Sequence, residues 1–119
     1  MSKNKKKFGD IGEDIACKYL TEKGFSIIDR NYFYGHGEID IIAKISNELV
    51  FVEVKTRKSI EYGYPETSIT KNKIKQIKKT AEAYLYENNI KDQICRFDFI
   101  GILMLDNNEP VITHIKNAF

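Results

Sequence analysis

Residues 37–57 read GEIDIIAKISNELVFVEVKTR, and this stretch decides the fold. It contains two runs rich in β-branched and other apolar side chains, with Ser46-Asn47 between them. Such runs on either side of a short polar turn predict a β-hairpin. We therefore expect antiparallel strands at residues 38–45 and 48–56.

The second of these strands carries a charged face. Alternate side chains of a strand share a face, so Glu53, Lys55 and Arg57 are expected to point one way, and Val52 and Val54 the other. The valine face can enter the core. The charged face on a central-looking strand needs an explanation, because buried charges must be paired or bind a ligand.

A carboxylate in the first strand, Asp40, supplies the second half of this pattern. The hairpin can bring Asp40 beside Glu53, and two carboxylates this close repel unless a cation or a proton lies between them. Mg²⁺ or Mn²⁺ fits such a site because hard cations prefer oxygen ligands. Lys55 would face a metal-bound water or a phosphate, as an orienting group, a base or an electrostatic stabiliser. The alternative is a structural ion-pair cluster.

Apolar spacing and the placement of glycine and proline predict the other elements. Gly24 is suited to closing a helix, Thr70 to capping one, and the loop of residues 57–70 lacks periodicity. The helices are expected at residues 6–23 and 71–88, and further strands at 25–33, 94–105 and 111–115, with Asn107-Asn108 as a turn. The predicted fold is α/β, in the order αβββαββ: a mixed β-sheet flanked by helices.

The composition is that of one small domain. The chain has 119 residues, so we expect a single domain over 1–119 with a flexible basic tail at 1–6. The net charge, 19 − 17 = +2, is too small to indicate a nucleic-acid partner by itself. Cys17 and Cys95 are expected to be reduced core residues. No signal peptide or membrane-spanning run is visible, which predicts a cytoplasmic protein without a membrane partner.

Positive charge is concentrated on one side of the second predicted helix. Lys71, Lys75, Lys78 and Lys79 lie away from its apolar stripe. Lysines in such a cluster favour contact with the phosphates of a nucleic acid, and Arg57 on the Glu53 face could add a further contact. The alternative for the lysines is a solvated helix face.

Five motifs together resemble the YraN family of bacterial proteins, over about residues 8–105. In chain order they are Gly12-Glu13 with Ala16, Gly37-Glu38-Ile39-Asp40, Phe51-Val52-Glu53-Val54-Lys55-Thr56-Arg57, Gly63 with Pro65, and Arg96-Phe97-Asp98. An aspartate followed by Glu-x-Lys is weak evidence alone, whereas five motifs in order are specific.

This resemblance implies a restriction-endonuclease-like fold of the PD-(D/E)xK nuclease superfamily, similar to Holliday-junction resolvases. It implies Asp40, Glu53 and Lys55 as the catalytic residues, with Asp40 and Glu53 as metal ligands. Glu13 would be a further metal-side catalytic carboxylate, although the residues alone also allow a solvated helix charge. Ile39 stands where the superfamily often has proline. Resolvase-like relatives act as dimers, which makes a homodimer plausible here.

Several residues keep two interpretations. In this superfamily the second helix often places a polar side chain near the active site, which makes Lys73 and Gln76 candidate nucleic-acid contacts. Arg96 and Asp98 either pair with each other or support the site, and we favour support. Aromatic residues could stack on unpaired bases or pack in the core, with Phe33 expected in the core; they are Tyr32, Phe33, Tyr34, Tyr62 and Tyr64.

The first functional hypothesis is a Mg²⁺- or Mn²⁺-dependent nuclease that hydrolyses phosphodiester bonds, with DNA as the expected substrate. A chain this small has little surface for reading sequence, so we expect recognition of junctions, flaps or ends, as in repair or recombination. The second hypothesis is a nucleic-acid-binding module that keeps the fold without turnover. A third is an interaction protein with no affinity for DNA.

Overall fold

The predicted order of helices and strands is confirmed. The computed structural model describes residues 2–106 and 109–119, with side chains from residue 8 onward. A short 3₁₀ helix, η1, is added inside the loop that the sequence left irregular. The elements are α1 (Ser2–Glu22), β1 (Ser26–Tyr34), β2 (Gly37–Ile45), β3 (Glu48–Arg57), η1 (Pro65–Ser68), α2 (Lys71–Glu87), β4 (Ile94–Leu103) and β5 (Val111–Ile115).

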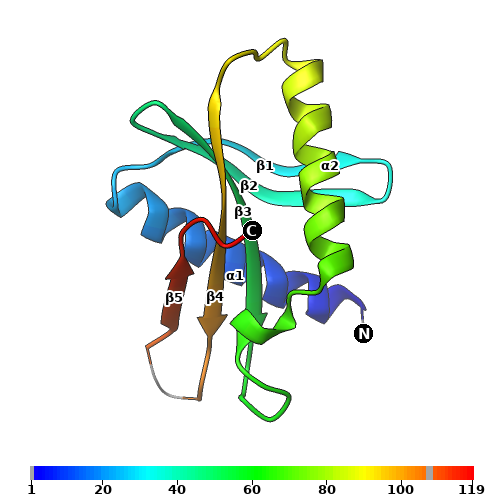
Figure 1. Ribbon diagram of the computed structural model, residues 1–119. Coiled ribbons are helices and arrows are strands. Elements are labelled where there is room, and N and C mark those ends of the chain that lie inside the picture. Colours follow the sequence, from blue (N-terminus) through cyan, green and yellow to red (C-terminus); the bar gives the residue numbers. More distant parts are fainter. Residues whose placement is uncertain (1, 107–108) are drawn as a thin grey trace.

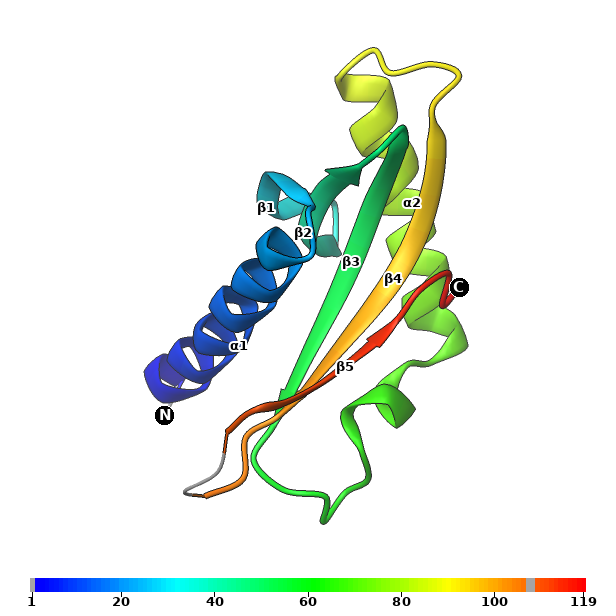
Figure 2. The ribbon, with the colours of Figure 1, turned by 90° about the vertical axis from the view of Figure 1, so that its left-hand side faces the viewer.

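The strands form one mixed sheet in the order β1-β2-β3-β4-β5, so each strand lies beside its neighbour in sequence (Figure 1). β3 and β4 are parallel, and the other pairs are antiparallel. The connection between the parallel strands contains α2, as parallel pairing requires a crossover. The two helices cover opposite faces of the sheet (Figure 2).

Each face of the sheet has its own apolar core. On the α1 side, Ala16 and Leu20 pack with Val50 and Val52. On the α2 side, Ile77 and other residues of α2 pack with side chains that include Phe51. The alternation along β3 sends successive residues into different cores, as expected for a central strand buried on both faces. The predicted entry of Val52 into the core is confirmed.

The first helix begins at Ser2, four residues before the predicted start at Lys6. Residues 2–6, predicted as a flexible basic tail, are therefore helical. The physical reason is that lysine is a good helix former and the segment contains no glycine or proline to stop the helix. At the other end Gly24 has φ +96°, and the Phe25 amide donates to the Leu20 carbonyl, which confirms glycine as the terminator.

Other boundaries hold with small corrections. The Thr70 hydroxyl oxygen accepts from the Lys73 amide at 3.1 Å, which confirms the predicted N-cap. β4 ends at Leu103 instead of Leu105. Phe33, expected in the core, is 65% exposed, because it lies at the end of the edge strand β1, beside the β1–β2 turn. The predicted turn at Asn107-Asn108 lies outside the described residues.

A glycine in α1 allows the helix to lie close to β3. A Cβ atom added at Gly12 would lie 1.8 Å from Thr56 Oγ1 and 2.9 Å from Thr56 Cβ. Rotation of the threonine could move Oγ1 away but not Cβ. The sequence signals this approach only as a glycine inside a helical pattern, which costs about 1 kcal/mol relative to alanine.

We expect Gly12→Ala to lower the free energy of unfolding by ~1–3 kcal/mol, because the new methyl group overpacks the α1–β3 contact. Urea denaturation measures the change. Gly9→Ala is the matched control, since nothing lies within 4 Å of a Cβ there and alanine raises helix propensity. The control should be neutral or stabilising. Equal effects of the two substitutions would contradict the close contact.

Candidate functional site

The site lies where two strands of the sheet separate. β2 and β3 pair from Ile45↔Glu48 to Ile41↔Val52, and β3 continues beside β4 to Arg57↔Leu103. Just beyond the last β2–β3 pair, Asp40 Oδ2 accepts the Val54 amide at 2.8 Å. The Asp40 side chain thus accepts the Val54 amide at a position where β2 no longer pairs with β3. Asp40 is 8% exposed, so its carboxyl group lies inside the fork.

Glu53 lies on the α2 side of this fork. Its side chain is 11% exposed, and its Oε2 atom lies 3.3 Å from Lys73 Nζ. Its other oxygen, Oε1, is buried and has no hydrogen-bond partner. A buried carboxylate oxygen without a partner is costly, and such a group calls for a specific explanation.

Asp40 and Glu53 cannot both be ionised at low cost. Burial first, and the adjacent Glu53 charge second, raise the pKa of Asp40 well above its usual value, although the Val54 amide acts in the opposite direction. This electrostatic conflict is the one expected when two carboxylates share a site without a cation. The predicted proximity of Asp40 and Glu53 is present in the structure.

The donor set fits a hard divalent cation. Two carboxylates supply oxygen ligands, and the free Oε1 atom of Glu53 is the donor that a cation would take. Among residues 2–106 and 109–119, however, no group of three His, Cys, Asp or Glu side chains is gathered as a metal site. Water and a substrate phosphate would have to complete the coordination, as Mg²⁺ commonly requires.

Glu13 lies on α1 at the edge of this region. It accepts a hydrogen bond from Asn31 Nδ2 at 2.9 Å and lies 3.6 Å from the Arg30 guanidinium. Burial, partly offset by the Asn31 hydrogen bond, raises the pKa of Glu13, and its charge contributes to the raised pKa of Asp40. Glu13 is therefore electrostatically connected to the pair and held by β1.

Sequence reasoning missed two participants. Asn31 Nδ2 also donates to Glu38 Oε2 at 3.1 Å, so that Asn31 joins Glu13 to Glu38. Glu38 precedes Asp40 by two positions, and that spacing would have placed it on the Asp40 face of a regular strand. Nothing in the sequence around Asn31 singles it out, although φ +54° marks it as a backbone irregularity in the structure.

Lys55 and Arg57 continue the charged side of β3. Lys55 is exposed, two positions beyond Glu53, so its ammonium group is accessible to a ligand from solvent. Arg57 is half-buried, and its Nε atom has no hydrogen-bond partner. A buried guanidinium nitrogen without a partner has the donor capacity that a phosphate oxygen requires.

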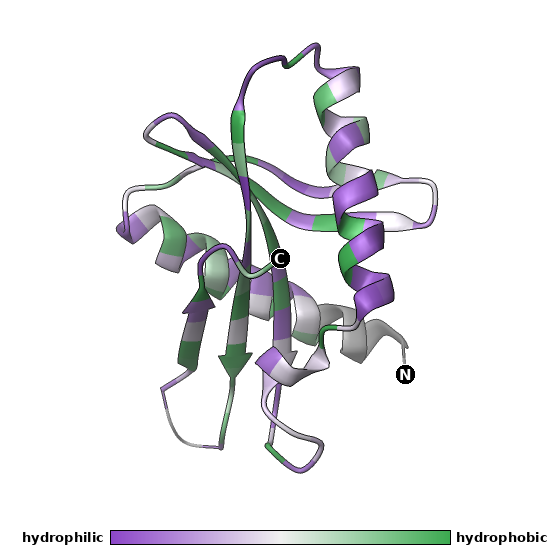
Figure 3. Ribbon diagram, in the orientation of Figure 1, coloured by the Kyte–Doolittle hydropathy of each residue, from purple (hydrophilic) through white to green (hydrophobic). Residues whose placement is uncertain are grey.

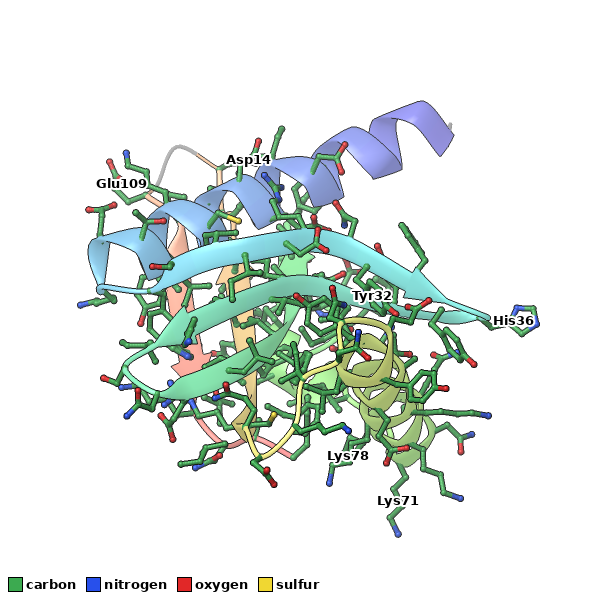
Figure 4. The ribbon with its side chains drawn as sticks, turned by 90° about the horizontal axis from the view of Figure 1, so that it is seen from above. Asp14, Tyr32, His36, Lys71, Lys78 and Glu109 are labelled. Atoms are coloured by element: carbon green, nitrogen blue, oxygen red, sulfur yellow. The ribbon has the colours of Figure 1, made fainter. Side chains whose placement is uncertain are left out.

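The α2 residues divide into separate groups. Lys73 reaches Glu53, whereas Gln76 Nε2 donates to the His36 carbonyl at 2.9 Å and is held against the β1–β2 turn. Lys75 lines a pocket with Lys73 and Gln76. Lys71 is exposed and lies on the side of α2 that carries Lys78, away from the turn at His36 (Figure 4). Hydrophilic residues predominate in the N-terminal half of α2 (Figure 3).

Arg96 and Asp98 do not support the site, contrary to the favoured interpretation. Arg96 donates to Asp98 through Nε at 3.0 Å and to Glu48 through Nη1 at 2.7 Å. Asp98 also binds His114 Nε2 at 2.7 Å and the Asn117 amide at 3.2 Å. The pair therefore joins β3, β4 and the end of the chain on the α1 face of the sheet.

Comparison with known proteins gives a consistent result. The family model "Uncharacterised protein family UPF0102" matches residues 12–102. A UPF0102 protein of Trichlorobacter lovleyi is 42% identical and aligns with all of this chain and 94% of its own length. UPF0102 proteins of Clostridioides difficile and Persephonella marina are 45% and 48% identical, over 98% and 93% of this chain and 99% and 91% of their own lengths. These names state no activity.

In the part of the chain that the structure describes, no helix is long and apolar enough to cross a membrane.

Proposed function

The chain belongs to the uncharacterised protein family UPF0102, which is the predicted YraN family, and we propose that it is a divalent-metal-dependent nuclease. One observation carries this proposal: the buried Asp40–Glu53 pair contains a carboxylate oxygen with no partner. Both acids are also held at a fork in the sheet. A cation there would stabilise their ionised forms and would supply the contact that Glu53 Oε1 lacks.

Each residue has a role in this proposal. Asp40 and Glu53 hold Mg²⁺ or Mn²⁺, and the Val54 amide fixes the orientation of Asp40. A bound ion supplies charge neutralisation at the phosphodiester and activation of water. Lys55, accessible on the same strand, orients the attacking water or stabilises charge on the phosphate. Lys73 neutralises Glu53 until the ion binds.

The proposed substrate is DNA with an irregular structure, such as a junction, a flap or an end. The chain has 119 residues, and the described basic side chains near the fork project from one strand and one helix. Lysine and arginine contacts to phosphates position a protein without reading sequence. We therefore expect the protein to select its substrate by shape and to act in repair or recombination.

A test of the ion site does not require activity. At a metal concentration tenfold above Kd, Mn²⁺ or Mg²⁺ should stabilise the protein by ~1.4 kcal/mol, or roughly 5 °C in melting temperature. Thermal denaturation in metal and in EDTA measures this difference. Glu22→Gln, which alters an exposed acid of α1, should keep the full shift. A shift absent from the native chain, or unchanged in Glu53→Gln, would exclude the proposed ligand pair.

Cleavage is tested with labelled duplex, single-stranded, flapped and four-way DNA in Mg²⁺, Mn²⁺ or EDTA. We expect cutting only with metal and mainly of the branched or open substrates. The absence of a group of three metal-binding side chains among the described residues favours one alternative, a non-catalytic nucleic-acid-binding module. DNA binding without cleavage in either metal would support that alternative.

A further inference from the structure

A pocket of about 690 Å³ lies between the β1–β2 turn and α2, beside the proposed site. It is large enough for a ligand of nucleotide size, since small-molecule pockets are typically ~300–1,000 Å³. Tyr34, Gly35, His36 and Gly37 line it from the turn. The α2 residues that line it include Lys73, Lys75, Gln76, Lys79 and Thr80.

The floor of the pocket is firmly held. Gln76 Nε2 donates to the His36 carbonyl at 2.9 Å, and the Thr80 hydroxyl donates to the Gln76 carbonyl at 2.7 Å. Gly37 packs so closely on α2 that an added Cβ would lie 2.0 Å from Thr80 Oγ1. The His36 ring points outward from the tip of the turn, so it leaves the pocket open (Figure 4). A bound ligand would meet a preformed surface.

The pocket attracts anions. Its lining includes Lys73, Lys75 and Lys79, and no carboxylate is among the lining residues that the structure describes. Lys75 and Lys79 are four residues apart, which places them on one helix face one turn from each other. Lys73 connects the pocket to the proposed metal ligand, since its Nζ lies 3.3 Å from Glu53 Oε2. An anion here would therefore lie next to the proposed reaction site.

Tyr34 forms one wall and marks the end of the positive region. The residue is 48% exposed. Beyond it a smaller pocket of about 280 Å³ shares Tyr34 and Lys79 but is also lined by Glu82 and Glu87. The charge thus reverses past Tyr34, so a phosphate chain that follows the lysines would stop at the tyrosine ring.

We propose that this pocket binds an unpaired nucleotide of a nucleic-acid strand, with phosphates on Lys75 and Lys79 and a base on the Tyr34 ring. A base inside a duplex is stacked on both sides, whereas an unpaired base can offer its flat face to an aromatic ring. This inference rests on the proposed function and defines its substrate as a strand that carries unpaired nucleotides beside the cleaved bond.

Binding in EDTA tests the inference without cleavage. Fluorescence anisotropy compares a labelled single-stranded 12-mer, a blunt 12-base-pair duplex and the same duplex with a three-nucleotide overhang. We expect the single strand and the overhang to bind at least ~10-fold more tightly than the blunt duplex. Tyr34→Ala should weaken their binding by ~5–150-fold, the range for loss of one base–aromatic contact. Tyr34→Phe should preserve it, because the ring remains.

Two matched controls come from α2. Tyr86 is 86% exposed and lies outside the pocket, so Tyr86→Ala should not change binding. Lys75→Ala and Lys79→Ala should each reduce the salt dependence of single-strand binding by ~0.7 in log–log slope. Lys78→Ala should leave it unchanged, since Lys78 lies over the Phe97 ring, 5.8 Å from its centroid, and not in the pocket.

The outcomes separate the two proposals. Equal binding of blunt duplex and single strand, unaffected by Tyr34→Ala, would overturn the pocket inference even if the protein cleaves DNA. Preference for the unpaired substrates, lost in Tyr34→Ala, would support it even if neither metal promotes cleavage. Competition by free dTMP at the same concentration as the 12-mer would overturn the assignment to a strand, because the ligand would then be a mononucleotide.

Discussion

Replacing Glu53 with glutamine should reduce metal-dependent cleavage by at least ~100-fold while leaving the protein as stable as before or more stable. Glutamine keeps the shape of the side chain but removes the charge that the metal would need, and even outer-shell changes at metal sites cost ~10–100-fold. Stability should not fall, because the Glu53 charge is one cause of the raised pKa of the buried Asp40, and removing that charge lowers the cost of protonating Asp40 on folding. Cleavage rates and thermal denaturation in EDTA measure the two effects.

A loss of cleavage without a loss of stability would distinguish a reactive site from a structural ion pair. If Glu53 served only to pair with Lys73, 3.3 Å away, its neutralisation would lower stability and leave any cleavage intact. That result would contradict the proposed role. Glu22→Gln serves as the control, since it removes an exposed carboxylate of α1, and it should change neither property.

Lys55→Met, measured beside Glu53→Gln, separates metal binding from catalysis. Lys55 is exposed and is not a proposed ligand, so the variant should keep the melting-temperature shift caused by Mn²⁺. It should still lose cleavage, because the ammonium group no longer acts on the water or the phosphate. A Lys55→Met protein that cuts at the native rate would remove Lys55 from the mechanism.

The second large effect is expected at Asp98, where Asp98→Asn should cost ~3–5 kcal/mol of unfolding free energy, the range for breaking a buried ion pair. Asp98 is 0% exposed and is bound by Arg96, His114 and the Asn117 amide. Removing its charge leaves the buried Arg96 guanidinium paired with Glu48 on one side alone among the described residues. Chemical denaturation at pH 7 measures the loss.

Protonation of Asp98 should also make the protein less stable at low pH. Burial tends to raise the pKa of Asp98, but hydrogen bonds from His114, Arg96 and Asn117 outweigh it and hold the pKa below its usual value. Its stabilisation is therefore fully present above about pH 4 and decreases as the pH falls through the lowered pKa. The difference between the native chain and Asp98→Asn should shrink below pH 4.

Asp10→Asn provides the control for that experiment, because Asp10 is an exposed acid on α1. It should unfold like the native chain at every pH tested. A constant difference between the native chain and Asp98→Asn from pH 7 to pH 3 would contradict the ionised, hydrogen-bonded state assigned to Asp98.

Much of the fold could be predicted from local patterns. The apolar runs, Gly24 and Thr70 predicted the order of helices and strands, because strand alternation, helix caps and helix ends depend on residues close in sequence. The start of α1 was wrong by four residues, since a lysine-rich segment has no signal that separates a tail from a helix.

The candidate site was only partly predictable. The shared face of Glu53, Lys55 and Arg57 follows from the two-residue period of a strand, and the hairpin placed Asp40 near Glu53. The sequence could not show that Lys73 would reach Glu53 while Gln76 bound the turn at His36. It also misassigned Arg96 and Asp98, whose partner His114 comes from a different strand.

The sequence by itself determined which residues share a face and which segments form helices and strands, because these properties repeat with the period of the backbone. Only the tertiary structure decided that β2 leaves β3 at Ile41, so that Asp40 binds the Val54 amide, and that Glu53 Oε1 stays buried without a partner. Those features arise where separate elements meet, and the packing of both cores sets their positions.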